Sequence, residues 1–140
     1  MAVYVGGTGD ANKLEDYEEG TWTPSVAGNG SGTYTQRNGW YTKTGQTVNI
    51  YFYIDISSAN YGGGSYFNMY GLPFTSTGNT CGSFMSKNHT TNNNRWFVLY
   101  IADGDTHLQS YGTEANASWE RLAADSTFHM IGHISYRTNS

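Results

Sequence analysis

Four acidic residues lie within five positions near the start of the chain, in the stretch LEDYEEGTWTP that runs from Leu14 to Pro24. Two facing carboxylates could act as the acid pair of a glycosidase, but that chemistry needs carboxyl groups ~5 to ~9.5 Å apart across a sugar. Sequence neighbours point in different directions, and the alternate spacing of a calcium loop is absent. We interpret these acids as a solvated or partner-facing link before the first strand, with a cation site as the alternative: Glu15, Asp16, Glu18 and Glu19.

Metal binding by histidine is the second candidate chemistry. His129 and His133 share one face of a strand-like segment, and four strand residues separate them by roughly 13 Å. A single zinc ion needs its ligands at about 2 Å, so this pair does not share a metal. His89 and His107 fall in or beside loops. We predict no metal site within one subunit, although the axis of a symmetric trimer could bring three copies of one histidine together.

No set of residues supplies a nucleophile, a base and an orienting group. The sole cysteine, Cys81, lies in the strand-like stretch TCGSFM and is predicted to pack as a small core residue. The stretch GGTGD, from Gly6 to Asp10, is unlike a nucleotide site because no strand precedes it and no Lys-Ser/Thr pair follows. We therefore predict neither an enzyme activity nor a cofactor.

Aromatic rings beside amides are the pattern that points to a ligand. Sugars place their CH faces on aromatic rings and bond their hydroxyls to polar side chains. Two predicted loops, SANYGGGSY and HTTNNNRW, carry this combination, although ordinary turns use the same residue types. The candidate glycan contacts are Tyr61, Tyr66, Asn92, Asn93 and Asn94.

The composition favours a small all-β protein that oligomerises. Of the 140 residues, 16% are aromatic and only 13% are charged, and the formal net charge is -4. Tyr and Trp favour strands and interfaces, and a thin aliphatic core gains burial from neighbouring subunits. The acidic balance argues against nucleic acid as a partner. No apolar run is long enough to cross a membrane, and the first residues lack the pattern of a signal peptide.

Short strands alternate with turns rich in Gly, Asn and Ser from Thr21 onward, as is typical of a sandwich or barrel. The clearest strand is VNIYFYIDI, residues 48–56, in which aliphatic side chains share one face. The stretch TYTQRNGWYTKTG predicts a hairpin that turns at Asn38-Gly39. Residues 96–102, WFVLYIA, are apolar on both faces, so we expect the core on one side and a neighbouring subunit on the other.

The C-terminal quarter is predicted to contain one short helix in NASWERLAAD and a last strand over 127–137. Residues 1–20 show no periodicity, and we predict that they form an extended N-terminal arm. Residues 21–140 are predicted to form a single antiparallel β-sandwich domain of jelly-roll-like type.

Four motifs together resemble a module of bacteriophage virion proteins. They are LEDYEEGTWTPSV, GTYTQRNGWYTKTGQTVNIYFYI, GLPFTS and FHMIGHISYRTN, and the resemblance covers Asp10 to Thr138. The module recurs in tail-fibre and tailspike-like chains, especially of environmental and cyanobacterial phages. The resemblance implies a trimeric β-sandwich on the outside of the particle, and it carries over no catalytic residues because the shared motif is structural.

We therefore predict a virion structural protein, made in the host cytoplasm, that forms a homotrimer on the virion exterior. The resemblance begins about ten residues after Met1, without the shaft of a fibre. We accordingly expect a small accessory protein that decorates or cements the capsid and contacts other virion proteins, above all the major capsid protein. The alternative is the receptor- or glycan-binding module of a tail fibre, with a host surface glycan as its partner.

Two sets of apolar residues are predicted to make these contacts. The arm is expected to hold its neighbours through Val3, Tyr4, Val5, Leu14, Tyr17 and Trp22. The trimer interface is expected to use Tyr51, Tyr53, Trp96, Phe97, Leu99 and Ile131.

Overall fold

The computed structural model of the protein is an antiparallel β structure. This structure describes residues 3–4, 13–14, 17–26, 31–62, 66–88, 96–113, 118–123 and 125–140. Within these ranges every regular element is a strand, which confirms the predicted all-β antiparallel class. The strands are β1 (Val3–Tyr4), β2 (Lys13–Leu14), β3 (Tyr17–Trp22), β4 (Ser31–Thr44), β5 (Thr47–Asn60), β6 (Asn68–Tyr70), β7 (Thr80–Lys87), β8 (Trp96–Ile101), β9 (His107–Thr113), β10 (Glu120–Arg121) and β11 (Phe128–Arg137).

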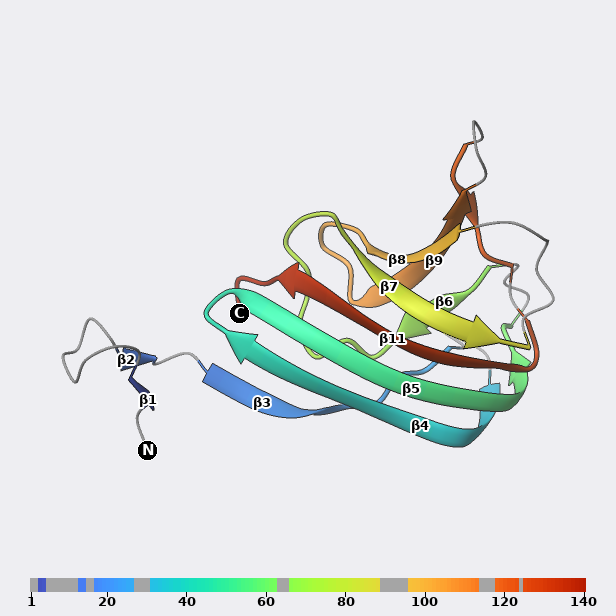
Figure 1. Ribbon diagram of the computed structural model, residues 1–140, viewed down its shortest axis with the longest axis horizontal. Helices are drawn as coiled ribbons and strands as arrows, with labels where there is room; N and C mark the ends of the chain where they lie inside the picture. Colours follow the sequence, from blue (N-terminus) through green and yellow to red (C-terminus); the bar gives the residue numbers. More distant parts are fainter. Residues whose placement is uncertain are drawn as a thin grey trace.

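Nine of these strands belong to one curled sheet in the order β10-β9-β8-β7-β11-β5-β4-β3, with β6 also paired to β9 (Figure 1). The sheet bends at β7, where Thr80–Gly82 pair with β8 and Ser83–Lys87 pair with β11. Ser25, just after β3, forms an antiparallel bridge with Tyr70 of β6. A jelly-roll-like sandwich of two separate sheets is therefore not confirmed, because a single sheet curls into a half-barrel.

The concave side of the half-barrel holds the core. The predicted alternation of β5 is confirmed, since Val48, Ile50, Phe52, Ile54 and Ile56 are all buried while Tyr51 between them is exposed. Alternate residues of β11 join them from the neighbouring strand. The other buried apolar side chains are Trp22, Val26, Phe67, Met69, Leu72, Leu99, Ile101, Leu108, Leu122, Phe128, Met130, Ile134 and Tyr136.

The predicted hairpin turn at Asn38-Gly39 is wrong. Strand β4 runs through both residues, and the turn comes at Gly45, whose φ of 57° suits a residue without a Cβ. Gly39 is instead the cross-strand partner of Trp22, and a Cβ atom at Gly39 would lie 2.6 Å from Trp22 Nε1. Glycine stands in this strand because the indole ring needs the space above it.

The predicted short helix is also wrong in its described part, residues 118–123. Glu120 and Arg121 form β10 and pair with Gly112 and Tyr111 of β9. The next residue, Leu122, is 3% exposed and belongs to the core. Tertiary packing of Leu122 and pairing with β9 thus override the local helical preference.

Only four residues of the first sixteen are described, and they pair as Val3 with Leu14 and Tyr4 with Lys13. Val5 and the side chains of Val3, Tyr4 and Leu14 lie outside the described part. Strand β3 begins at Tyr17, so the sheet includes residues that the prediction gave to the arm. Trp22, predicted to contact a partner, is instead only 7% exposed and donates from Nε1 to the Tyr51 carbonyl oxygen at 3.2 Å.

Candidate functional site

The acidic stretch is part of the β3–β4 ladder in its described half. Tyr41 donates to Glu18 at 2.5 Å, and Tyr17 donates to Glu19 at 2.9 Å. These hydrogen bonds to carboxylates raise the pKa of both tyrosines. Consecutive strand residues point to opposite faces, so Glu18 and Glu19 do not face each other as an acid pair. Glu15 and Asp16 lie outside the described residues.

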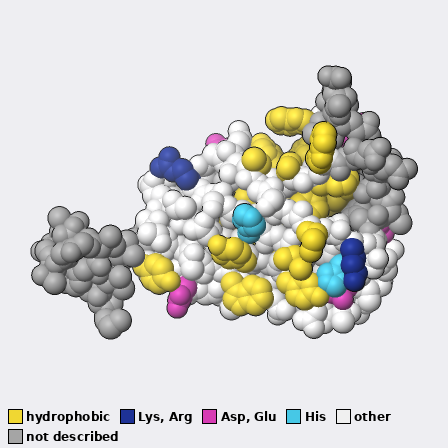
Figure 2. Space-filling model, viewed as in Figure 1, with side chains coloured by type: hydrophobic (Ala, Val, Ile, Leu, Met, Phe, Trp, Pro, Cys, Tyr) yellow, Lys and Arg dark blue, Asp and Glu magenta, His cyan; other side chains and the backbone are white. Residues whose placement is uncertain are grey.

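The convex face of β4, β5, β11 and β7 exposes four large apolar side chains. Trp40, Tyr51, Met85 and Ile131 are 49%, 52%, 69% and 46% exposed. We call these four residues the outer apolar surface. The register places Trp40 beside Tyr51 and Ile131 beside Met85. They line an open depression of about 470 Å³, and Figure 2 shows apolar side chains gathered on this face.

One histidine lies inside the outer apolar surface. The ring of His133 stacks on Tyr51 with centroids 6.1 Å apart and an interplanar angle of 29°. Its Nε2 is 3.0 Å from Ser83 Oγ, the hydroxyl of the neighbouring strand. This imidazole thus already has a polar partner within the chain.

A polar row borders the outer apolar surface on one side. Tyr53 OH is 2.7 Å from His129 Nε2, and His129 Nδ1 is 3.8 Å from Asp55 Oδ1. The second distance exceeds that of a hydrogen bond. The three groups therefore do not form the continuous chain that activates a hydroxyl nucleophile. Lys87 continues the row as the cross-strand partner of His129.

A second feature lies on the convex face where β7, β8 and β9 meet. It is a pocket of about 310 Å³ lined by Cys81, Trp96, Val98, Tyr100, Tyr111, Gly112 and Trp119, which we call the tryptophan pocket. Trp96 and Trp119 are 72% and 77% exposed. Cys81, predicted to pack in the core, is exposed here. Its position follows from strand alternation, because the next residue, Gly82, faces the other side, where a Cβ atom would lie 2.6 Å from Cβ of the buried Ile134.

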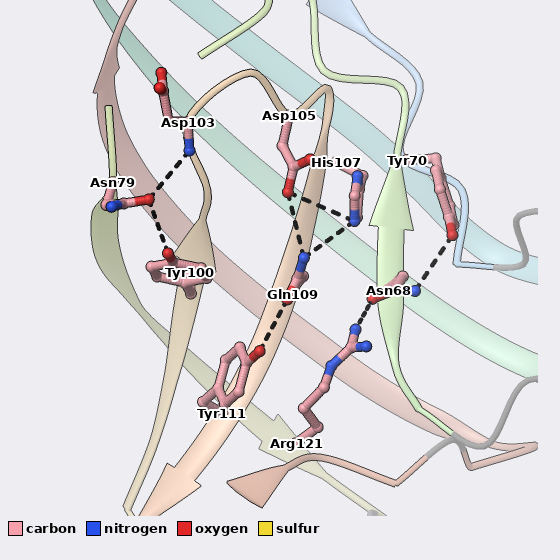
Figure 3. Close-up of polar contacts among 10 residues, drawn as sticks. All are labelled: Asn68, Tyr70, Asn79, Tyr100, Asp103, Asp105, His107, Gln109, Tyr111 and Arg121. Atoms are coloured by element: carbon pink, nitrogen blue, oxygen red, sulfur yellow. Dashed lines mark hydrogen bonds and ion pairs between the residues drawn. The ribbon is translucent and has the colours of Figure 1, made fainter. Parts of the chain in front are cut away.

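Polar side chains continue from the tryptophan pocket along β9 and β6, as Figure 3 shows. Tyr100 donates to Asn79 at 2.8 Å, and Tyr111 donates to Gln109 at 3.1 Å. Gln109 Nε2 in turn lies 3.3 Å from an Asp105 oxygen. Further along the face, Asn68 donates to Tyr70 at 3.2 Å and accepts from Arg121, while His107 stacks on Tyr70 at 5.2 Å. The two tyrosine rings of the pocket are therefore held by amide side chains.

The structure divides the predicted trimer residues among three places. Tyr51, Ile131 and the half-buried Tyr53 lie on the convex face together, whereas Trp96 lies in the tryptophan pocket. Leu99 is fully buried and Phe97 packs against the same core. Strand alternation turns both side chains toward the core of their own chain.

Two of the five predicted glycan residues, Tyr61 and Tyr66, lie in the described part of the chain. Tyr61 packs against the core and donates to the Asp125 carbonyl oxygen at 2.9 Å, and its burial raises the pKa of the hydroxyl. Tyr66 is half exposed and lies 5.0 Å from the Arg121 guanidinium. Asn92, Asn93 and Asn94 lie outside the described residues. Trp119 was not among the predicted contact residues. A large aromatic residue in the polar stretch NASWERL was the feature of the sequence that could have identified it.

No group of three His, Cys, Asp or Glu side chains in the described ranges is arranged to hold a metal ion. The same ranges contain no helix that could span a membrane. Comparisons of the chain with protein-family models, with curated proteins and with solved structures found no match.

Proposed function

We propose that the chain is a non-enzymatic structural protein of a bacteriophage virion, which forms a homotrimer on the outside of the particle and decorates or cements the capsid. The observation that carries this proposal is the outer apolar surface, Trp40, Tyr51, Met85 and Ile131, which is about half exposed or more at every position. Contiguous apolar patches on soluble proteins mark interaction sites.

The composition of the surface favours a protein partner, and a second copy of the chain is the simplest one. Trp, Tyr and Met are enriched at the centres of protein interfaces, and charged residues are depleted there. Here the polar row of Asp55, His129 and Lys87 borders the apolar centre, as a rim borders a core. His133 Nε2 already lies 3.0 Å from Ser83 Oγ, so one of the two ring nitrogens of that histidine keeps a polar partner when the centre is covered.

The phage assignment is supported by the residues that carry the resemblance. Within that resemblance, Tyr17–Trp22 and the strand that follows them form the β3–β4 ladder, in which Trp22 covers Gly39 and the Tyr41 ring covers Gly20. A motif that fixes strand register has a structural role. A structural module of a virion needs a stable fold and does not need a catalytic centre.

Oligomeric mass and capsid binding test the proposal. Light scattering of the full chain should give three times the 15.4 kDa subunit mass, and Ile131→Glu should give monomers because it places a charge in the apolar centre. The matched control is Thr106→Glu, at an exposed position outside the surface, which should stay trimeric. The wild-type protein should also sediment with phage heads and not with tails. A folded wild-type monomer at micromolar concentration would contradict the trimer.

A further inference from the structure

We infer that the convex face of β8 and β9 binds a neutral saccharide, with the tryptophan pocket as the platform for a sugar ring. The pocket residues Trp96, Trp119, Tyr100 and Tyr111 would contact the CH face of the sugar, and the adjoining amides would bond its hydroxyls. This is a binding function in addition to the structural one proposed above, and it uses other residues.

The pocket exposes more aromatic surface than a monomer needs for its own packing. Trp96 and Trp119 are each more than 70% exposed and line the same cavity of about 310 Å³. That volume is at the lower end of the ~300 to ~1,000 Å³ usual for small-molecule sites. Large aromatic side chains are mostly covered in folded proteins, so two of them open in one concavity indicate a ligand.

The floor of the pocket is held in place before any ligand binds. Tyr100 and Tyr111 meet edge to face, with centroids 5.6 Å apart and an interplanar angle of 89°. Their hydroxyls donate to Asn79 and Gln109, and the Arg121 guanidinium lies 5.9 Å from the Tyr111 ring. Rings fixed in this way lose little conformational freedom when a ligand stacks on them.

Hydrogen-bonding groups with spare capacity adjoin the platform. Each of the two tyrosine hydroxyls donates its proton to an amide oxygen, so its own oxygen can still accept a bond from a ligand hydroxyl. Asn79 is exposed, and Gln109 and His107 are partly exposed in the row of Figure 3. A ligand that covers the pocket and reaches along β9 therefore meets an apolar surface first and a polar one next.

An apolar surface that continues into a polar one fits a saccharide better than it fits a charged ligand or a purely apolar ligand. The described lining of the pocket contains no charged residue, which disfavours a phosphate or a carboxylate at its centre. A purely apolar ligand would use the rings but not the amide row. A sugar ring has a CH face for the aromatic rings and hydroxyls for Asn79 and Gln109.

Binding can be measured on the full chain with chitotriose, cellotriose and maltotriose as neutral probes at millimolar concentration. At least one of them should change the tryptophan fluorescence saturably. Trp119→Ala and Trp96→Ala should each weaken that binding by about tenfold or more, as expected for loss of a stacked ring. The matched control is Thr75→Ala, at an exposed position outside both the tryptophan pocket and the outer apolar surface, which should bind with unchanged affinity.

Cys81 provides a second readout that needs no substitution. It is the sole cysteine of the chain and lines the pocket, so a bound saccharide should slow its alkylation by iodoacetamide. Failure of all three probes to bind would overturn the inference, as would equal weakening by Thr75→Ala. A change of oligomeric mass in Trp96→Ala or Trp119→Ala would overturn it too, by showing that the pocket is a subunit contact.

Discussion

The ring of Phe52 lies over Gly132 of the neighbouring strand, where a Cβ atom would come within 2.6 Å of Phe52 Cζ. That Cβ atom would also lie 2.9 Å from Phe84 Cβ on the other neighbouring strand. We expect Gly132→Ala to lower the free energy of unfolding by ~1 to ~3 kcal/mol, because the new methyl group overpacks the space between the Phe52 ring and the Phe84 side chain. Urea denaturation monitored by circular dichroism measures this change.

The cause can be separated from a general effect on β11. Ser135→Ala, at an exposed position of the same strand, should change the free energy of unfolding by less than about 0.5 kcal/mol. In a Phe52→Leu background, Gly132→Ala should destabilise less than it does alone, because the smaller side chain leaves room. Additive effects in this double-mutant cycle would contradict the proposed ring contact.

Trp22 is the buried aromatic side chain of the edge strand β3, and its indole both packs on Gly39 and donates to the Tyr51 carbonyl oxygen. Trp22→Phe should lower the free energy of unfolding by ~1 to ~3 kcal/mol, through a lost hydrogen bond and a small cavity. Tyr17→Phe, at the exposed start of the same strand, is the control and should be nearly neutral. Equal decreases in the free energy of unfolding of the two variants would contradict a specific stabilising contribution of the buried Trp22 side chain.

Stability should fall at alkaline pH because of buried tyrosines. Burial raises the pKa of Tyr136, whose hydroxyl donates to the Phe74 carbonyl oxygen at 3.1 Å, and burial likewise raises the pKa of Tyr61. The folded state thus keeps these protons when the unfolded chain begins to release them near pH ~10. The contribution is complete below pH ~10 and is lost as pH rises toward the folded pKa.

Chemical denaturation between about pH 8 and pH 11 should show this loss, with a slope of at most about 1.4 kcal/mol per pH unit for each group. Tyr136→Phe should have a shallower alkaline slope than the wild type. Ser135→Ala, at an exposed position beside Tyr136 on the same strand, is the control, and its slope should match the wild type. A wild-type slope in Tyr136→Phe would contradict the assignment.

Cys81 is exposed in the fold, so its thiol should react with one equivalent of Ellman's reagent without denaturant. We expect a rate within about tenfold of that in urea, since reactivity follows exposure and thiolate fraction. A thiol that reacts only after unfolding would show that the residue is covered.

The sequence predicts a strand best where one face of that strand is buried and the other is exposed. Strand β5 shows this best, because Val48 to Ile56 alternate strictly and the buried set is apolar. The turn at Asn38-Gly39 was misread because its glycine serves Trp22, a residue whose position depends on the register of two strands. Local sequence does not contain that register.

The candidate surfaces were only partly predictable for the same reason. Tyr51 and Ile131 were identified from the face that the core does not use, and both are exposed. Leu99 was misplaced because a segment apolar on both faces gives no sign of which face is covered by its own chain. The tryptophan pocket contains Cys81, Trp96 and Trp119 from three separate segments. The strand order of the sheet brings these segments together, and the local sequence does not show that order.

Strand β7 changes partners at Gly82, so the two halves of the sheet share one strand and little else of their hydrogen-bonded framework. The two halves still share one core, in which Leu99 and Ile101 of β8 join the buried side chains of β5. Under the proposed function, β4, β5 and β11 would hold neighbouring subunits, and the outer face of β8 and β9 would stay open for a separate ligand.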